Sequence, residues 1–255
     1  STPKPSSAAS DVYKRQNIGK RKNNQDQVCI VQNNASQVLA VICDGMGGHN
    51  SGELASKVVC EYIVDCFKIM PAFDSLEEAK IWLEGAVKEA HQITKRLSQT
   101  SLVHAGMGTT VVVALVLKEH YLIASVGDSR CYFINHELKQ LTIDDTFVNE
   151  LIKSGMINKD EAKNHPKRNV LMKAIGVSDE IDAKIQIFPL TQGYLLLCSD
   201  GLYNSVEDLQ LFQIMSTNAL LKDKLEALVK LALNQGASDN ISIAAIQIDG
   251  GDLDE

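Results

Sequence analysis

The order of apolar and polar positions along the chain predicts a mixture of strands and helices. Apolar runs of strand length lie at residues 28–31, 38–43, 109–117, 121–126, 130–134, 185–188, 194–198 and 241–248. Apolar positions at helical spacing predict long helices over residues 53–69, 76–97 and 220–233. Strand pairs, then two long helices, further strands, a helix and a last strand indicate an α+β fold with packed layers.

Some of these patterns predict local packing as well. The polar residues 33–36 between the first two strand runs predict a hairpin. In the first long helix the apolar face is predicted at Leu54, Val58, Tyr62 and Cys66. In the second it is predicted at Ile81, Leu83, Val87, Ala90 and Ile93. The short connections between the three strand runs from residue 109 to residue 134 favour antiparallel pairing of successive strands.

The polar segments divide the chain into one domain with two tails. Residues 1–16 are rich in Ser, Pro, Lys and Ala, which predicts a disordered leader or an artificial extension. Residues 17–248 are long enough to bury a full core as a single domain. Within them, residues 141–176 are polar and contain a short helix near 148–154, which predicts an irregular surface subdomain. Residues 249–255 are predicted to be a solvated acidic tail.

Charge and cysteine content narrow the classes of partner. The chain has 25 Lys and Arg against 32 Asp and Glu, a formal net charge of −7, which disfavours nucleic acid and anionic membranes as partners. No apolar run is long enough to span a bilayer, and residues 1–16 lack the apolar stretch of a secretory signal. The six cysteines form no CxxC motif and lie mostly in apolar runs, which predicts free thiols in a reducing cytoplasm.

Four aspartates share one kind of position, at the end of a predicted strand. Asp44, Asp128 and Asp200 follow strand runs, and Asp239 precedes the last one. If those strands are neighbours, the four carboxylates converge on one edge of a sheet. Such a cluster needs protons or cations, because two charges ~4 Å apart repel by about 4 kcal/mol at an effective dielectric constant of 20. An all-oxygen ligand set suits magnesium, manganese or calcium rather than zinc or copper.

A simpler explanation exists for each aspartate taken alone, since Asp-Gly is common turn chemistry. Asp249-Gly250 in the predicted tail is such a case, because no buried strand follows it. The joint occurrence of the four aspartates at strand ends favours the cluster. Gly45, directly after Asp44, would let an ion approach the backbone closely, so its carbonyl is a further candidate ligand.

Other candidates carry less chemistry. Residues 45–48 (Gly-Met-Gly-Gly) lack both the GxGxxG spacing and the P-loop Lys-Ser/Thr of nucleotide-binding loops. Ser129 and Ser199 lie outside any GxSxG nucleophile motif. His49 and His165 form no zinc-binding pattern and are predicted to lie at the surface or behind a ligand.

Short motifs, taken in order, resemble those of the metal-dependent protein serine/threonine phosphatases of the protein phosphatase 2C family, in their compact bacterial form. The matching segments are residues 19–26 (GKRKNNQD), 41–49 (VICDGMGGH), 106–110 (GMGTT), 126–130 (VGDSR), 141–146 (LTIDDT), 165–169 (HPKRN), 197–202 (LCSDGL) and 238–240 (SDN). Each motif is short, but their order and spacing span nearly all of residues 18–248.

The resemblance implies a four-layer α-β-β-α sandwich with two central antiparallel sheets, and it identifies residues 141–176 as a flap beside the active site. It implies two manganese or magnesium ions held by Asp44, Gly45, Asp200 and Asp239. Asp128 matches the ligand of a third, weaker ion. Asp44 would hold a metal-activated water, with no protein nucleophile.

The resemblance also implies roles around the ions. Arg21 matches the arginine that binds the substrate phosphate, while Asp26, Gln25 and Asn240 lie next to the ligands. The implied substrates are proteins carrying phosphoserine or phosphothreonine, placed there by a serine/threonine kinase. We expect the protein to act as a monomer.

The chain departs from the family pattern at three positions. Gln25 stands where many members have Glu, and Asp145 replaces a common His at the start of the flap. Met46 stands where eukaryotic members have a histidine proposed as general acid, so no motif supplies that acid and His49 is a weak substitute.

Two other classes of function are open at this point. A catalytically silent phosphoprotein-binding module of the same fold is disfavoured, because Asp44, Asp200 and Asp239 are all present. A calcium-binding structural domain is disfavoured because the sequence has no EF-hand loop and gives Arg21 no task.

Overall fold

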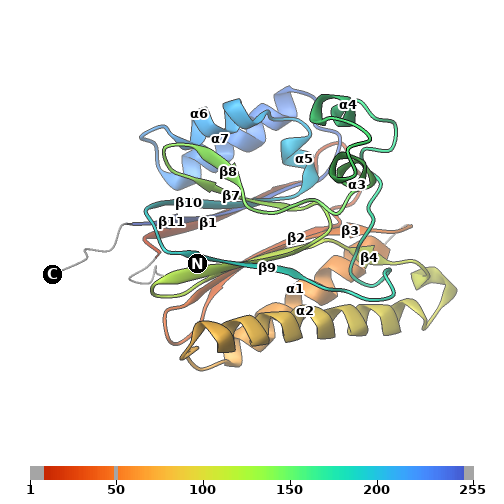
Figure 1. Cartoon of the computed structure of the whole chain (residues 1–255), viewed down its shortest axis with the longest axis horizontal. Helices are drawn as coiled ribbons and strands as arrows, with labels where there is room; N and C mark the ends of the chain where they lie inside the picture. The colour runs from red at the N-terminus through yellow and green to blue at the C-terminus, as the bar shows by residue number, and fades with distance from the viewer. Residues whose placement is uncertain (1–8, 49–50, 250–255) are drawn as a thin grey trace.

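Two antiparallel β-sheets lie face to face between two layers of helices in the computed structural model, which describes residues 9–48 and 51–249 (Figure 1). One sheet has the order β1-β11-β10-β7-β8, formed by β1 (Asp11–Asn17), β11 (Ile241–Ile248), β10 (Gly193–Cys198), β7 (Arg130–Ile134) and β8 (Leu138–Gln140). The other has the order β2-β3-β5-β6-β9, formed by β2 (Asp26–Gln32), β3 (Val38–Met46), β5 (Val111–Val116), β6 (His120–Val126) and β9 (Lys184–Pro189), with β4 (Gly108–Thr109) paired to β3. The predicted four-layer α+β sandwich is confirmed.

Each layer boundary has its own apolar core. Side chains from both sheets, among them Ile42, Val112 and Leu197, form the core between the sheets. The long helices α1 (Ser51–Ile69) and α2 (Leu76–Ser98) pack on the outer face of the β2–β9 sheet. The helices α5 (Asp200–Tyr203), α6 (Asp208–Met215) and α7 (Leu221–Asn234) cover the outer face of the other sheet. Central strands such as β5 are buried on both faces, which explains their unbroken apolar sequences.

The prediction of a disordered leader is wrong for residues 11–16, which belong to strand β1. This strand pairs antiparallel with β11 from Asp11–Gln247 to Asn17–Ile241. It lies at the edge of its sheet, where Val12 is its one buried residue and Tyr13 packs on the outer core, and its backbone pairs with β11 along its whole length. That is why no apolar period marks it. Residues 1–8, the rest of the predicted leader, and residues 250–255 of the predicted tail lie outside the described residues.

The apolar faces of the two long helices are partly wrong. In α1 the fully buried side chains are displaced by one position from the predicted face and include Ala55, Val59 and Ile63, whereas Tyr62 is only half-buried. In α2 the buried face contains Leu83, Val87 and Ala90 as predicted, but Ile81 is exposed. A step of four residues advances more than one helical turn, so a face chosen at that step drifts away from the core.

The three successive strands after residue 109 do not all pair with one another. β5 and β6 pair antiparallel as predicted. β7 instead crosses to the other sheet, where it pairs with β10 and β8. The turn of Gly127 and Asp128 makes this crossing, and it therefore lies between the two sheets. The predicted hairpin is confirmed by the antiparallel pairing of β2 with β3.

The flap over residues 141–176 connects the two sheets and holds the helices α3 (Phe147–Lys153) and α4 (Lys159–Lys163). Thr146 and Asn158 accept backbone N–H bonds at the starts of these helices. A short 3₁₀ helix, η1 (Leu102–His104), precedes β4. All six cysteines are free thiols, as predicted. None of the helices in the described residues is long and apolar enough to cross a membrane.

Candidate active site

The four strand-end aspartates meet at one end of the sandwich, but they come from two sheets rather than one. Asp44 lies in β3 of one sheet, whereas Asp200 follows β10 and Asp239 precedes β11 of the other. Asp128 lies in the turn that crosses between the sheets. The prediction of a single sheet edge is therefore wrong, although the predicted convergence holds, because the two sheets end together here (Figure 1).

A cavity of about 280 Å³ brings these carboxylates together. It is lined by Arg21, Gln25, Asp44, Gly45, Met46, Gly47, Thr110, Asp128, Asn169, Leu171, Asp200, Asp239 and Asn240. Asn169 and Leu171 come from the flap, so the flap forms one wall. A larger cavity, of about 450 Å³, lies at the opposite ends of β7, β10 and β11, and among the described residues that line it Asp249 is the only acidic one.

The backbone of Asp44 is fixed on both sides by two threonines. Its N–H donates to the hydroxyl of Thr110 at 3.0 Å, and its carbonyl accepts from the hydroxyl of Thr109 at 2.8 Å and the N–H of Thr110 at 2.9 Å. The next position must be glycine, because a Cβ on Gly45 would lie 2.1 Å from the carbonyl oxygen of Gly52 in α1. Strand β3 thus ends in a rigid segment that keeps Asp44 at the cavity.

The carboxyl of Asp44 lies among other carboxyls, and no described hydrogen bond or ion pair joins it to a lysine or arginine. Burial, followed by repulsion from Asp26 and Asp200, raises the pKa of Asp44 well above its ordinary value. Burial and repulsion from Asp128 and Asp239 raise the pKa of Asp200 to about 7. Asp200 Oδ1 is buried without a hydrogen-bond partner. Among the bonds described, Asp200 Oδ2 accepts one hydrogen bond, from the side-chain amide of Asn204 at 3.1 Å.

Asp26 and Asp128 complete this group of strained carboxyls. Asp26 lies directly opposite Asp44 across the β2–β3 pair and is 1% exposed. Burial raises its pKa to about 6, although its Oδ2 accepts the hydroxyl of Ser199 at 2.7 Å. Burial and then repulsion from Asp144 raise the pKa of Asp128 to about 6 as well. Both residues lie where the sequence predicted them, Asp128 at the cavity and Asp26 behind it.

Arg21 is the one basic residue among the described residues that line the cavity. Its Nη2 donates to Asp239 Oδ2 at 2.7 Å, and its side chain is 58% exposed. Hydrogen bonding to Asp239, reinforced by its charge, raises the pKa of Arg21. The guanidinium thus stands at the mouth of the cavity, facing the carboxylates.

Asn240 fixes the loop that carries Arg21. Its Nδ2 donates to the carbonyls of Ile18 at 2.9 Å and Asn23 at 3.0 Å, and its Oδ1 accepts the N–H of Gln25 at 2.8 Å. The amide therefore spans the whole turn on either side of Arg21. The sequence placed Asn240 next to the ligands, and its position in the loop gives that prediction a physical role.

The donor set fits hard divalent cations. Carboxylate oxygens and the backbone of Gly45 surround the cavity, its lining in the described residues includes no His or Cys, and Asp200 Oδ1 lacks any partner. Within the described residues, no three His, Cys, Asp or Glu side chains already converge as a ligand group. Asp239 Oδ2 is bonded to Arg21 instead.

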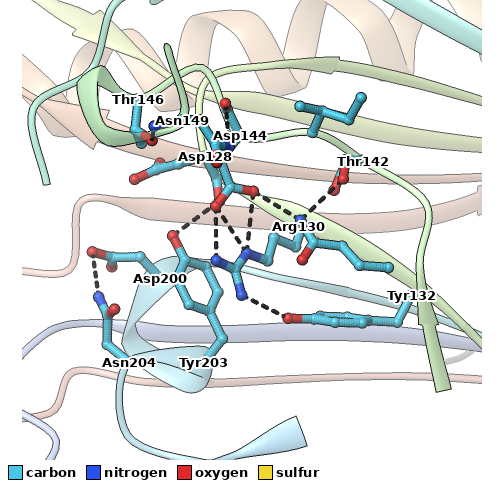
Figure 2. A network of polar contacts seen from close by, with 12 residues as sticks. Asp128, Arg130, Tyr132, Thr142, Asp144, Thr146, Asn149, Asp200, Tyr203 and Asn204 are labelled. Atoms are coloured by element: carbon cyan, nitrogen blue, oxygen red, sulfur yellow. Dashed lines mark hydrogen bonds and ion pairs between the residues drawn. The ribbon is translucent and has the colours of Figure 1, made fainter. Parts of the chain in front are cut away.

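Several neighbours of the site were not predicted from the sequence. Asp144, Asp145 and Tyr203 surround the turn of Asp128, as Figure 2 shows for Asp144 and Tyr203. The adjacent acids Asp144 and Asp145, at the start of a flap that contains several lysines, are the sequence feature that could have indicated this support. The hydroxyl of Ser199 donates to Asp26 Oδ2, and Ser199 is buried. His49 lies outside the described residues.

Comparisons with known proteins agree on one family. The sequence profile of protein phosphatase 2C matches residues 15–235. The serine/threonine phosphatase stp of Listeria monocytogenes is 35% identical over 231 residues, 90% of this chain and 92% of that protein. The structure of Stp1 from Staphylococcus aureus has a TM-score of 0.90 at 35% identity, covering 94% of this chain and 95% of that one. The catalytic domain of PstP in complex with two manganese ions has a TM-score of 0.81 at 28% identity, covering 93% and 97%.

Proposed function

The chain belongs to the protein phosphatase 2C family and is a protein serine/threonine phosphatase, and we propose that it hydrolyses phosphoserine and phosphothreonine with the help of divalent cations held by the aspartate cluster. One observation carries this proposal. Asp44, Asp128 and Asp200 share a cavity whose one described basic residue, Arg21, is bonded to Asp239 instead, and the pKa values of the three aspartates are raised. Bound cations would relieve that repulsion.

The proposed ligands are Asp44, Asp200, Asp239 and the carbonyl of Gly45, with Asp128 serving a third and weaker ion. Manganese and magnesium suit these oxygens, and the manganese-bound PstP structure supports this choice. When bound, the cations would lower the pKa of a water molecule for attack on phosphorus and neutralise charge on the phosphate oxygens. Asp44 lies near carboxylates of both sheets and would hold the ions together with them.

Arg21 is proposed to bind the substrate phosphate. Its guanidinium stands at the cavity mouth, carries a permanent charge and presents a planar fork that matches two phosphate oxygens. A phosphate entering the cavity would compete with Asp239 for this side chain. Asn240 would keep the loop of Arg21 in place during that exchange.

The partners follow from this chemistry. We propose that the substrates are proteins phosphorylated by a serine/threonine kinase, as the names of the relatives suggest for their own substrates. The six free thiols support a reducing compartment such as the cytoplasm. We expect a monomer to be sufficient, because all proposed ligands and Arg21 come from one chain.

The test is hydrolysis of a phosphothreonine peptide by metal-stripped protein, with and without added manganese. We expect turnover that depends on manganese. Asp239→Asn should lower it by more than the about 10–100-fold that loss of a group behind a metal ligand costs. Asp249→Asn is the matched control, because it changes an aspartate at the other end of the sheets and should leave the rate unchanged. No turnover by a folded protein that binds manganese would support the silent phosphoprotein-binding module instead.

A further inference from the structure

Behind the candidate metal site lies a buried polar group that we call the Arg130 cluster, formed by Arg130, Tyr132, Asp144 and Tyr203 (Figure 2). Arg130 Nη2 and Nε donate to Asp144 at 2.7 and 3.1 Å, and Arg130 Nη1 donates to the hydroxyl of Tyr132 at 3.0 Å. The guanidinium carbon lies 3.6 Å from the centre of the Tyr203 ring. The cluster therefore joins strand β7, the start of the flap and helix α5.

Tyr203 connects this cluster directly to the site. It follows Asp200 by three residues in α5, and its hydroxyl donates to the backbone carbonyl of Asp128 at 3.0 Å. Tyr132, the other tyrosine on Arg130, is fully buried and has no described bond to Asp128. The two phenols thus share one guanidinium, but only the hydroxyl of Tyr203 reaches the turn that carries Asp128.

Asp145 holds the same turn from the side of the flap. Its Oδ2 accepts the N–H of Gly127 at 3.1 Å, and its own N–H donates to the carbonyl of Gly127 at 2.8 Å. Lys184 of β9 forms an ion pair with Asp145, which balances the buried charge. Gly127 has φ +98°, and a Cβ there would lie 2.7 Å from a side-chain atom of Thr110. This strained crossing between the sheets needs such support.

The support matters because Asp128 and Asp200 line the same small cavity, where two carboxylates repel each other. Two free carboxylates would turn or move apart, and an ion between them would then lose a ligand. Tyr203 ties the turn of Asp128 to the helix of Asp200, and Asp145 ties the same turn to the flap. Residues that hold a metal ligand in position without contacting the metal commonly determine how tightly the ion is bound.

We propose that Tyr203 and Asp145 are positioning residues that fix Asp128 relative to Asp200 and so set the affinity for the weakest divalent cation of the site. This proposal rests on the function proposed above. It concerns the chain's own residues, and it assigns no contact with substrate to either of them.

The test is a titration of metal-stripped protein with manganese. Binding is measured by calorimetry and by the electron spin resonance signal of free manganese. Asp128→Asn first identifies the weakest class of sites, which we expect it to abolish. Tyr203→Phe removes one hydroxyl and keeps the ring under Arg130, so it should weaken that class by about tenfold and leave the tighter sites unchanged. Tyr132→Phe is the matched control and should leave every class unchanged.

Asp145→Ala tests the other support in the same titration, and we expect it too to weaken the class that depends on Asp128. The proposal is overturned if Tyr203→Phe binds manganese like the wild type, if both phenylalanine variants weaken binding equally, or if Asp128→Asn loses no class of sites. Wild-type protein that binds no manganese would instead contradict the function proposed above. Circular dichroism and melting temperature establish that each variant is folded.

Discussion

Two groups of carboxylates lie side by side at the same end of the molecule, and they differ in their basic partners. Asp144 and Asp145, which are 6% and 5% exposed, each have a basic partner in Arg130 and Lys184. Asp44 lines the cavity and, among the described contacts, has no basic side chain bonded to it. Its pKa is raised well above its ordinary value. Asp44 and Asp200 are only partly buried, whereas Asp144 and Asp145 are buried, so the two groups differ both in burial and in the internal cation.

The comparison separates stability from function. A buried carboxylate with its cation on the same chain is already compensated, and removing that cation is strongly destabilising. A buried carboxylate without one destabilises the fold until protons or cations arrive from solution. The first group forms the base of the flap, and the second forms the cavity. The strained group is therefore the one that points to a ligand.

The largest expected effect comes from breaking the first group. Arg130→Met leaves Asp144 buried without its partner and removes the hydrogen bond to the hydroxyl of Tyr132. We expect the free energy of unfolding to fall by about 3–5 kcal/mol, as measured by urea denaturation. Arg21→Met is the control, because its side chain is 58% exposed and its loss should cost under about 1 kcal/mol. Equal losses in the two variants would contradict the comparison.

Neutralising the second group should have the opposite sign. Asp44→Asn removes the carboxylate that Asp26, Asp200 and Asp128 repel. Without divalent ions, we expect the variant to be more stable than the wild type by about 1–2 kcal/mol, because functional sites often trade stability for activity. Phosphatase activity should be lost at the same time. A metal-free variant less stable than the wild type would count against repulsion at this site.

The pH dependence of stability gives a smaller effect. The pKa of Asp200 is raised to about 7, so above the ordinary pKa of a carboxyl the folded state binds more protons than the unfolded state. The free energy of unfolding therefore decreases as pH rises through that value. For metal-free wild type we expect a loss on the order of 1 kcal/mol between about pH 6.5 and about pH 8. Asp44→Asn should show a shallower decrease, and a steeper one would be the contrary result.

The pH range is chosen so that a buried histidine does not obscure the effect. Burial lowers the pKa of His91, whose Nδ1 accepts the N–H of Gly176 at 3.1 Å. The stabilising contribution of neutral His91 is lost as pH falls below the ordinary histidine value of about 6.5, which is the opposite direction. Above that value the carboxylates of the cavity dominate the slope.

The candidate site could be predicted further than its surroundings. Asp44, Asp200 and Asp239 lie at or next to the ends of strands. The ends of these strands can be located in the sequence because each strand is an apolar run. The Arg130 cluster could not be predicted in this way. Arg130 and Tyr203 are far apart in the sequence, and they meet only because β7 crosses to the sheet of β10. No local pattern encodes that crossing.

The fold shows the same limit. Strands buried on both faces, such as β5, can be predicted from their unbroken apolar sequence. Strand β1 has no such run, and the sequence therefore predicts a disordered leader where the structure has a strand paired with β11. The exposed position of Ile81 likewise depends on which side of α2 meets the sheet. Periodicity locates an element along the chain, but its neighbours decide its buried face.

If the carboxylates of Asp44 and Asp200 bind a divalent cation, manganese should stabilise the folded protein, and its effect on unfolding tests this directly. For the wild type, manganese at about 100 times its dissociation constant should raise the free energy of unfolding by about 2.7 kcal/mol per site. In Asp44→Asn the increase should be largely absent, so that the order of stability of the two proteins reverses when manganese is added. An equal increase in both proteins, or none in the wild type, would contradict the account.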